Sequence, residues 1–162
     1  MKKLLDLVKE NNFLGLKQLI KTGIDLNSKI DTEDGENIFF LALRYRADLD
    51  ILKLLIDNKL DLNYVNDYGV GILDEAVSSG NLDLVKYLID EQNLDPKQTK
   101  RKSAFTPLMQ ASSYGYIEII KYFVDYGVDI SQRDSDGLTA KDYARKLGQK
   151  RVVNYFNSLD NL

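Results

Sequence analysis

Apolar and polar positions alternate at helical spacing in short runs along the chain, and residues 104–131 show the pattern most clearly. Thr106 can cap a helix with its hydroxyl, and the proline that follows it suits the first helical position, where no backbone N–H is needed. Leu108 and Ala111 then mark a buried face, and Gly115 ends the run. The stretch therefore predicts a short first helix that ends near residue 115.

A second helix is predicted over about residues 117–126 of the same stretch. Its apolar positions share one face at helical spacing: Ile117, Ile120, Phe123 and Val124. Gly127 follows at the point where a helix commonly ends in the left-handed conformation. Helix, turn, helix and loop together form one structural unit.

The same unit recurs along the chain at a nearly constant period. Loop aspartates recur at Asp25, Asp61, Asp95 and Asp129, and alanines of the first helix recur at Ala42, Ala76, Ala111 and Ala144. Both markers keep one period, close to 34. A period near 33 with Thr-Pro-Leu and a following Ala is the signature of ankyrin repeats, in which a β-turn precedes two helices. The chain therefore resembles the ankyrin-repeat family over nearly its whole length.

The resemblance rests on three motifs, which are Thr106-Pro107-Leu108 with Ala111, the stretch from Gly80 to Ile89, and the stretch from Gly23 to Asn27. It implies an all-α, ankyrin-repeat solenoid of helix-turn-helix repeats with β-hairpin loops. We expect about five repeats in a single domain over residues 1–162. The expected repeats are residues 1–30 (the N-terminal cap), 31–64, 65–98, 99–131 and 132–162 (the C-terminal cap).

The second repeat departs from the motif at two places. Asn37 is its candidate helix cap, but one extra residue lies between Ala42 and Leu49. Lys59 stands where a glycine, such as Gly127, closes the helix in other repeats, so we expect a more strained or differently shaped turn there.

The later repeats depart in other ways. In the third repeat, Gly71 replaces the capping threonine, and the helix end holds one extra residue, with Asn93 able to adopt the left-handed conformation. In the fifth repeat, Asp142 lies three residues after the predicted cap Thr139, which is close to a capping box.

Composition excludes several classes of chemistry. The chain has no cysteine and no histidine, which excludes disulfides, Cys/His zinc sites, haem ligation by these residues, and Ser-His or Cys-His nucleophiles. The formal net charge of −3 at pH 7 gives no global attraction to nucleic acid or anionic membranes. We therefore expect no cofactor, no nucleic-acid partner and no membrane partner.

The amino terminus begins like a secretory signal, but Asp6, Lys9 and Glu10 interrupt the apolar run too early, so we interpret it as a helix. No stretch approaches the roughly 18 apolar residues that a membrane-spanning helix needs. The absence of cysteines suits a reducing compartment. These features predict a cytoplasmic protein, which we expect to be a monomer.

Two acidic clusters are candidate cation sites. One groups Asp31, Glu33, Asp34 and Glu36 on one hairpin, and the other is the stretch Asp134-Ser135-Asp136-Gly137. Neither fits a calcium loop, because with Gly137 at the sixth position the first would be Gln132 and the twelfth, normally Glu, would be Tyr143. We expect solvated hairpin tips and no metal.

Basic residues gather in the last two repeats, as Lys97, Lys100, Arg101, Lys102, Lys141, Arg145, Lys146, Lys150 and Arg151. Residues 1–81 carry ten basic and fourteen acidic side chains, whereas residues 82–162 carry twelve and eleven. Two interpretations remain open, an ordinary solvated surface or electrostatic steering of a bipolar partner. Nucleic-acid binding is disfavoured because the few aromatic residues near these charges form no recognisable stacking platform.

In ankyrin repeats the hairpin tips and the exposed side of the first helices line a concave groove, and the resemblance implies that a partner binds there. The partner-binding residues expected from this mapping are Glu33, Asp34, Glu36, Arg44, Tyr45, Asp67, Tyr68, Val70, Lys100, Arg101, Lys102, Phe105, Ser113 and Tyr114. Aromatic residues and arginine commonly dominate interface energies. The alternative is that tyrosine is simply common in this chain, with ten in all, and that some of these tyrosines pack between repeats.

We therefore expect a non-catalytic protein-protein interaction module, a scaffold that binds an unidentified protein partner. One alternative is a translocated effector of a host-associated microbe, indicated by the lone ankyrin architecture and the composition rich in Lys and Asn. Another is a small-ligand or enzymatic protein that uses Asp, Glu, Lys and Tyr in a local pocket. A buried carboxylate or lysine in a concavity, without a structural partner, would favour the latter.

Overall fold

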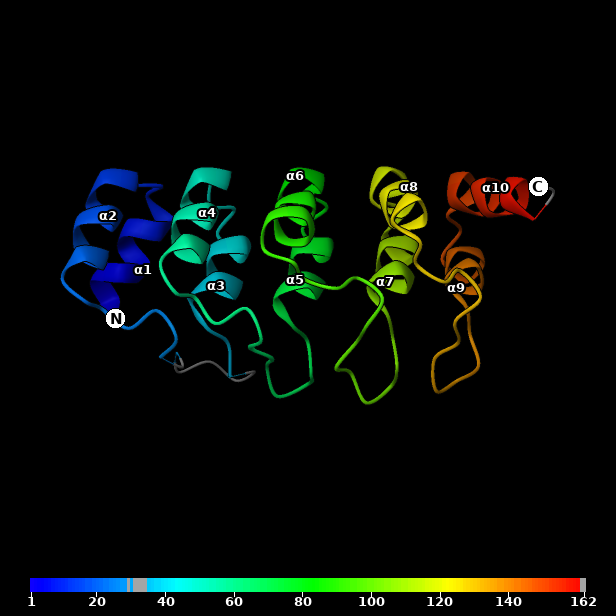
Figure 1. Ribbon diagram of the computed structural model, residues 1–162, viewed down its shortest axis with the longest axis horizontal. Coiled ribbons are helices and arrows are strands. Elements are labelled where there is room, and N and C mark those ends of the chain that lie inside the picture. The colour runs from blue at the N-terminus through cyan, green and yellow to red at the C-terminus, as the bar shows by residue number, and fades with distance from the viewer. Residues whose placement is uncertain (29, 31–34, 161–162) are drawn as a thin grey trace. The chain divides into compact units, whose positions relative to one another are not determined.

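The computed structural model describes residues 1–28, 30 and 35–160, which fold into short helices joined by loops (Figure 1). The helices are α1 (Lys2–Lys9), α2 (Phe13–Lys21), α3 (Ile38–Arg44), α4 (Leu49–Asp57), α5 (Ile72–Ser78), α6 (Leu82–Lys86), α7 (Pro107–Tyr114), α8 (Ile117–Tyr126), α9 (Ala140–Lys146) and α10 (Lys150–Leu159). A π-helical turn, Tyr87–Glu91, continues α6. The all-helical repeat architecture expected from the sequence is confirmed.

The predicted hairpin loops form turns closed by backbone hydrogen bonds. The N–H of Asn66 donates to the carbonyl of Val70 at 3.0 Å, and that of Asp134 donates to the carbonyl of Leu138 at the same distance. Among the described residues there is no β-strand, and a single isolated antiparallel bridge pairs Val65 with Gly71. The loops are therefore hairpin-like in their hydrogen bonding but do not extend into a sheet.

The chain divides into two compact units, residues 1–75 and 76–162, with the boundary inside α5. In the first unit, α1 packs on α3 and α2 packs on α4. The largest fully buried side chains of this unit come from all four helices, and they include Leu4, Leu16, Phe39, Phe40, Ile51, Leu52 and Leu55. Burial of each such side chain contributes about 1.5–3 kcal/mol, so the helix pairs are held together chiefly by apolar packing.

In the second unit the first helices of two repeats, α7 and α9, pack on each other, and α6 packs on α8. Leu84, Phe123 and Phe156 are fully buried there. Within this unit α7 and α9 lie below α8 and α10 in the view of Figure 1, so the first and second helices form two layers. The single-domain expectation for the whole chain stays a prediction.

Left-handed residues end the helices at the expected places. The backbone φ angle is 68° at Lys59 and 60° at Asn93, next to 83° at Gly23 and 89° at Gly127. The strained turn predicted at Lys59 is therefore confirmed, and so is the left-handed conformation of Asn93. A second set follows the first helices, and it comprises Asn11, Arg46, Gly80, Gly115 and Gly148, with φ between 49° and 79°.

The extra residue of the third repeat is absorbed within its second helix. There the N–H of Gln92 donates to the carbonyl of Tyr87, five residues earlier, at 3.2 Å. A π-helical turn takes in one more residue than an α-helical turn at the same point of the chain. The buried face of this helix, Tyr87, Leu88 and Ile89, is thereby kept against the core despite the insertion.

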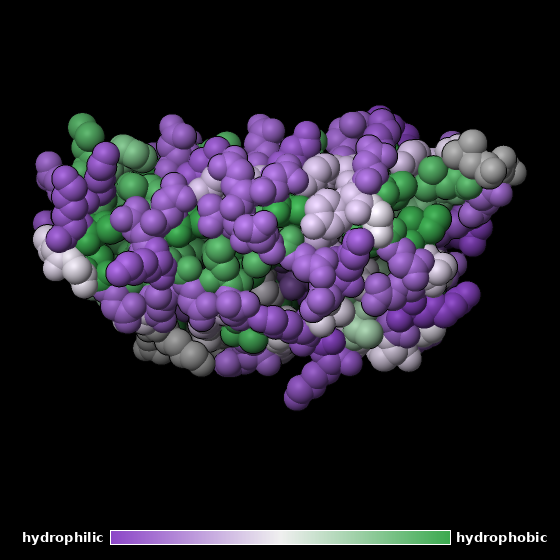
Figure 2. All heavy atoms as spheres, in the orientation of Figure 1, coloured by the Kyte–Doolittle hydropathy of each residue, from purple (hydrophilic) through white to green (hydrophobic). Residues whose placement is uncertain are grey.

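Hydrophilic side chains cover most of the surface seen in Figure 2, with apolar side chains between them, as expected for helices that bury only one face. None of the described helices combines the length and the hydrophobicity that a bilayer crossing would require.

Candidate binding face

Three residues of α7 share one side of the helix, because they lie three and four positions apart. They are Gln110, Ser113 and Tyr114. One repeat later along the chain, the corresponding positions are Tyr143 and Lys146 of α9 and Leu147, the residue directly after that helix. The last side chain of each row is open to solvent, since Tyr114 is 54% and Leu147 is 56% exposed.

Hydrogen bonds join the two repeats at both ends of these rows. The N–H of Ser135 donates to the carbonyl of Ser103 at 2.8 Å between the loops that precede α7 and α9. At the other end, the side-chain amide of Gln149 donates to the carbonyl of Ser113 at 2.9 Å. The surface between these bonds is therefore held at two edges.

We call this surface the first-helix face of the second unit. Its residues are Lys100, Arg101, Lys102, Phe105, Ser113, Tyr114, Tyr143, Lys146 and Leu147.

Arg101 and Gln110 connect the loop before α7 to that helix. The guanidinium of Arg101 donates a hydrogen bond to the side-chain carbonyl of Gln110, and the amide of Gln110 donates to the hydroxyl of Ser78 at the end of α5. The same guanidinium lies 5.1 Å from the centre of the Phe105 ring, within range of a cation–π contact. Together these contacts hold the loop that carries Arg101 against α7 and, through Gln110, against the end of α5.

Phe105 packs edge-on against Tyr143 of the next repeat, with ring centres 4.9 Å apart. The ring of Phe105 is therefore half-buried between repeats, and its partner Tyr143 is a tyrosine that packs between repeats, as the alternative raised for the tyrosines describes. Ser113 is also half-buried, and its hydroxyl donates to the carbonyl of Met109 at 2.9 Å. Tyr114 stacks on Tyr116, with ring centres 5.4 Å apart, and still leaves about half of its surface exposed.

The hydroxyl of Tyr143 donates a hydrogen bond to the buried carboxylate of Asp134. Burial is the largest single influence on the pKa of Asp134, and it raises that pKa. The remaining influences together outweigh burial and lower the pKa below 3.8; they are the hydroxyl of Tyr143, the N–H groups of Leu138 and Asp136, and the charge of Lys146. The same hydrogen bond, with burial next in size, raises the pKa of Tyr143 to about 12. Asp134 therefore stays ionised inside the loop, and Tyr143 stays neutral.

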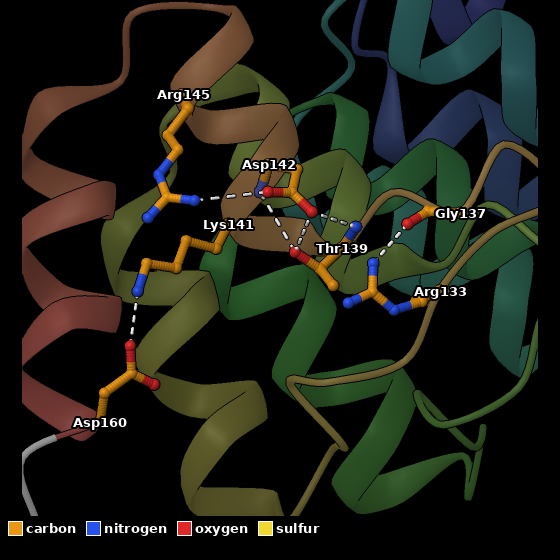
Figure 3. Close-up of polar contacts among 7 residues, drawn as sticks. All are labelled: Arg133, Gly137, Thr139, Lys141, Asp142, Arg145 and Asp160. Carbon is orange, nitrogen blue, oxygen red and sulfur yellow. Dashed lines mark hydrogen bonds and ion pairs between the residues drawn. The ribbon is translucent and has the colours of Figure 1, made fainter.

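Several charges near α9 are paired within the repeat (Figure 3). The hydroxyl of Thr139 accepts a hydrogen bond from the N–H of Asp142 at 3.2 Å, while the carboxylate of Asp142 accepts one from the N–H of Thr139 at 3.0 Å, so the predicted capping box is confirmed. Arg145 lies 3.5 Å from the same carboxylate, and Lys141 pairs with Asp160 at 2.5 Å. These groups stabilise the helices.

The predicted site residues of the first unit differ in exposure. Glu36 is 4% exposed and forms an ion pair with Arg44, so its carboxylate is buried and departs from the surface position expected for it. The ring of Tyr45 is partly covered by Lys9, whose ammonium lies 4.5 Å from the ring centre. Tyr68 is 70% exposed in the loop before α5.

The remaining predicted residues are placed as follows. Asp67, Lys100 and Lys102 are exposed, and Val70 is half-buried. Glu33, Asp34 and Asp31 lie outside the described residues. The predicted set thus divides between the two units, and the partner-binding role of these residues stays a prediction.

Lys146 and Leu147 lie on the same face as Tyr114 but are absent from the set expected from the sequence. They could have been identified from the repeat period, because Lys146 and Leu147 occupy the positions of the fifth repeat that correspond to Ser113 and Tyr114 of the fourth.

The buried carboxylates of the described residues have structural partners. Glu36 pairs with Arg44, Asp134 binds Tyr143, and Asp74 accepts the N–H of Gly71 at 2.8 Å. In the described part of the chain, no three Asp or Glu side chains gather in a way that could hold a metal ion. These observations do not favour the small-ligand alternative.

One cavity of about 500 Å³ lies in the first unit, between the loops that follow α2 and α4. Asp25 lines it, and hydrogen bonds from the hydroxyl of Ser28 and the N–H of Asn27 lower its pKa. This carboxylate therefore orders its own loop.

Two family models match the chain. A model described as Ankyrin repeats (3 copies) covers residues 4–100, and one described as Ankyrin repeats (many copies) covers residues 97–144. Together they span four of the helix pairs described above and the start of the fifth.

Similar proteins come from several animals. Alpha-latrocrustotoxin-Lt1a of Latrodectus tredecimguttatus is 29% identical over 143 residues, which is 83% of this chain and 10% of the toxin. The Transient receptor potential cation channel subfamily A member 1 homolog of Caenorhabditis elegans is 33% identical over 145 residues, 90% of this chain and 12% of the channel. Protein phosphatase 1 regulatory subunit 27 of Mus musculus is 32% identical over 102 residues, 62% of this chain and 65% of the subunit. The chain thus spans about a tenth of the first two relatives.

Proposed function

The chain belongs to the ankyrin-repeat family, and from this we propose that it is a non-catalytic module that binds a protein partner. Ankyrin repeats generally mediate interactions between proteins, and proteins built from them are typically non-enzymatic. One relative is, by its name, a regulatory subunit of protein phosphatase 1. This supports a role in association with another protein, although a fold alone does not specify the partner.

The proposed binding surface is the first-helix face of the second unit. The observation that carries this assignment is the exposure of Tyr114 and Leu147 at corresponding positions at the ends of adjacent first helices. The bond from Gln149 to the carbonyl of Ser113 links the ends of these helices, so the two side chains are presented on an ordered surface. Exposed aromatic and apolar groups on a rigid support are the kind that dominate interface energies, because little conformational entropy is lost on binding.

Affinity capture from a native lysate with the full chain, followed by identification of the captured protein, tests this proposal. The double variant Tyr114→Ala with Leu147→Ala should lose the captured protein, while its thermal unfolding midpoint stays within a few degrees of the parent, because both side chains are more than half exposed. Phe105 is kept, since its ring packs on Tyr143 and its removal would also destabilise the unit.

Tyr126→Ala is the matched control, because this tyrosine is 43% exposed at the end of the second helix α8. The control should capture the same protein as the parent chain. Equal capture by the double variant and the parent would contradict the proposed surface.

A further inference from the structure

Charged side chains of the second unit segregate between its two layers. The loops and first helices of its two complete repeats, residues 99–115 and 132–149, carry seven basic and three acidic side chains. The second helices with their following loops, residues 82–98, 116–131 and 150–160, carry five basic and eight acidic ones. The two layers therefore have opposite charge, although the whole chain has a formal net charge of only −3.

The acidic side chains of the basic layer are largely engaged. Asp134 is buried and bound by Tyr143, and Asp142 closes the capping box of α9 and is paired with Arg145. Lys102, Lys146 and the third acidic residue, Asp136, are exposed. The field that this layer presents to solvent is therefore positive, and it covers the same face as Tyr114 and Leu147.

We propose that the first-helix face binds an acidic segment of a protein partner, with Asp or Glu side chains against Lys100, Lys102 and Lys146. One apolar side chain of the segment packs against Tyr114 and Leu147. This inference rests on the proposed function, because it specifies the partner chemistry for the same face. Charge complementarity of this kind steers association and selects against partners of the wrong sign.

Two features favour an acidic protein segment over a nucleic acid or an anionic membrane. They are the exposed apolar side chains of Tyr114 and Leu147, and the acidic second-helix layer. An apolar contact at Tyr114 and Leu147 matches a protein side chain, whereas a sugar–phosphate backbone has no such group. The second-helix layer, with eight acidic side chains, repels a polyanion or an anionic membrane that extends past the basic face. A short acidic peptide segment avoids this repulsion, because it occupies the first-helix face alone.

Selection from a random library of displayed 12-residue peptides with the full chain tests the proposed chemistry. Enrichment of peptides that have several Asp or Glu residues and at least one large apolar residue is the expected result. A synthetic copy of an enriched peptide, labelled with fluorescein, should bind with an affinity that falls as the NaCl concentration rises, since exposed charge pairs are screened by salt.

Charge reversal then locates the site. The variant Lys102→Glu with Lys146→Glu should bind the labelled peptide about tenfold or more weakly, because two attractive contacts become repulsive. Lys150→Glu with Arg151→Glu is the matched control, since it changes the net charge by the same amount on the second-helix layer. The control should bind within about twofold of the parent, and circular dichroism should show that both variants are folded.

Other outcomes overturn the inference in distinguishable ways. Enrichment of neutral or basic peptides that depend on Tyr114 and Leu147 would reject the acidic partner and leave the proposed function standing. Equal weakening by both pairs of reversals would reject the assignment to this face. Tighter binding of a 20-nucleotide oligothymidine, or of phosphatidylserine vesicles, than of any selected peptide would replace the protein partner with another polyanion. A library that yields no enriched peptide would count against both proposals.

Discussion

Tyr143 on α9 donates a hydrogen bond from its hydroxyl to the carboxylate of Asp134 in the loop before that helix. Asp134 is only 8% exposed, and its carboxylate also accepts the N–H groups of Asp136 at 3.0 Å and Leu138 at 2.9 Å. The tyrosine ring in turn packs on Phe105 of the preceding repeat. One side chain therefore links a loop, a helix and a neighbouring repeat.

Removal of this hydroxyl should destabilise the protein. Tyr143→Phe keeps the ring against Phe105 but deprives a buried carboxylate of one donor, which should lower the free energy of unfolding by about 1–3 kcal/mol. Urea denaturation at pH 7, followed by circular dichroism, measures this change. Tyr114→Phe, at a ring that is 54% exposed, is the control and should change the free energy by less than about 0.5 kcal/mol. Equal effects of the two substitutions would show that the bond to Asp134 contributes nothing.

The same pair predicts how stability depends on pH. The pKa of Asp134 is lower in the folded state than its ordinary value of 3.8, so its contribution is present above that value and is lost as the pH falls through the folded-state pKa. The pKa of Tyr143 is raised from 10.0 to about 12, so its contribution is present below pH 10 and is lost as the pH rises toward 12.

The difference in unfolding free energy between the parent and Tyr143→Phe should therefore be largest between about pH 4 and pH 10 and shrink on both sides. Urea denaturation of both proteins from pH 3 to pH 11 measures it. A difference that stays constant over the whole range would mean that neither group titrates as proposed.

Local features of the fold were predictable because the residues that determine them are close in sequence. The cap at Thr139 with Asp142 depends on residues three positions apart, and the left-handed turns at Lys59 and Asn93 follow from the register of the repeats. The π-helical turn was not predicted, because the place where an inserted residue is absorbed depends on keeping Leu88 against the core.

Exposure of the candidate site was less predictable, because it depends on partners distant in sequence or on the next repeat. Glu36 is buried and pairs with Arg44, and Phe105 is half-buried and packs on Tyr143 of the next repeat. Repeat register assigns a residue to the first-helix face but does not say whether a neighbour covers it. Tyr114 and Tyr68 remain exposed as expected.

The start of α5 can be stabilised by adding the hydroxyl that the repeat motif lacks there. Half of a capping box already exists, since the N–H of Gly71 donates to the carboxylate of Asp74 at 2.8 Å. A β-carbon at Gly71 would meet no atom closer than 3.5 Å. Gly71→Ser should therefore raise the free energy of unfolding by about 0.5–1 kcal/mol, through the new cap and the reduced freedom of the unfolded chain.

Urea denaturation of the full chain measures the effect of Gly71→Ser. Gly69→Ser is the control two residues earlier, and it should be destabilising because φ at Gly69 is 76°, which disfavours any side chain. A loss of stability in Gly71→Ser would show that the added hydroxyl does not cap α5.

The turn after α4 carries strain that a glycine should relieve. Lys59 has φ of 68°, while Gly23 and Gly127 serve at the corresponding turns with φ of 83° and 89°. The carbonyl of Lys59 accepts the side-chain amide of Asn27 at 2.9 Å, and this bond is independent of the lysine side chain. Lys59→Gly should therefore keep the turn and raise the free energy of unfolding by up to about 1 kcal/mol. A left-handed residue with a β-carbon costs about 1–2 kcal/mol. The greater freedom of glycine in the unfolded chain cancels part of the gain.

Thermal and urea denaturation of Lys59→Gly, compared with Lys17→Gly, separates relief of strain from a general effect of glycine. Lys17 is an exposed residue in the middle of α2, where the same substitution should lower stability by about 1 kcal/mol because it weakens a helix interior. Opposite signs for the two variants are expected. If both variants were destabilised, the lysine side chain would have to support the left-handed turn at Lys59. The assumption that glycine is the favoured residue at every such turn of this chain would then be wrong.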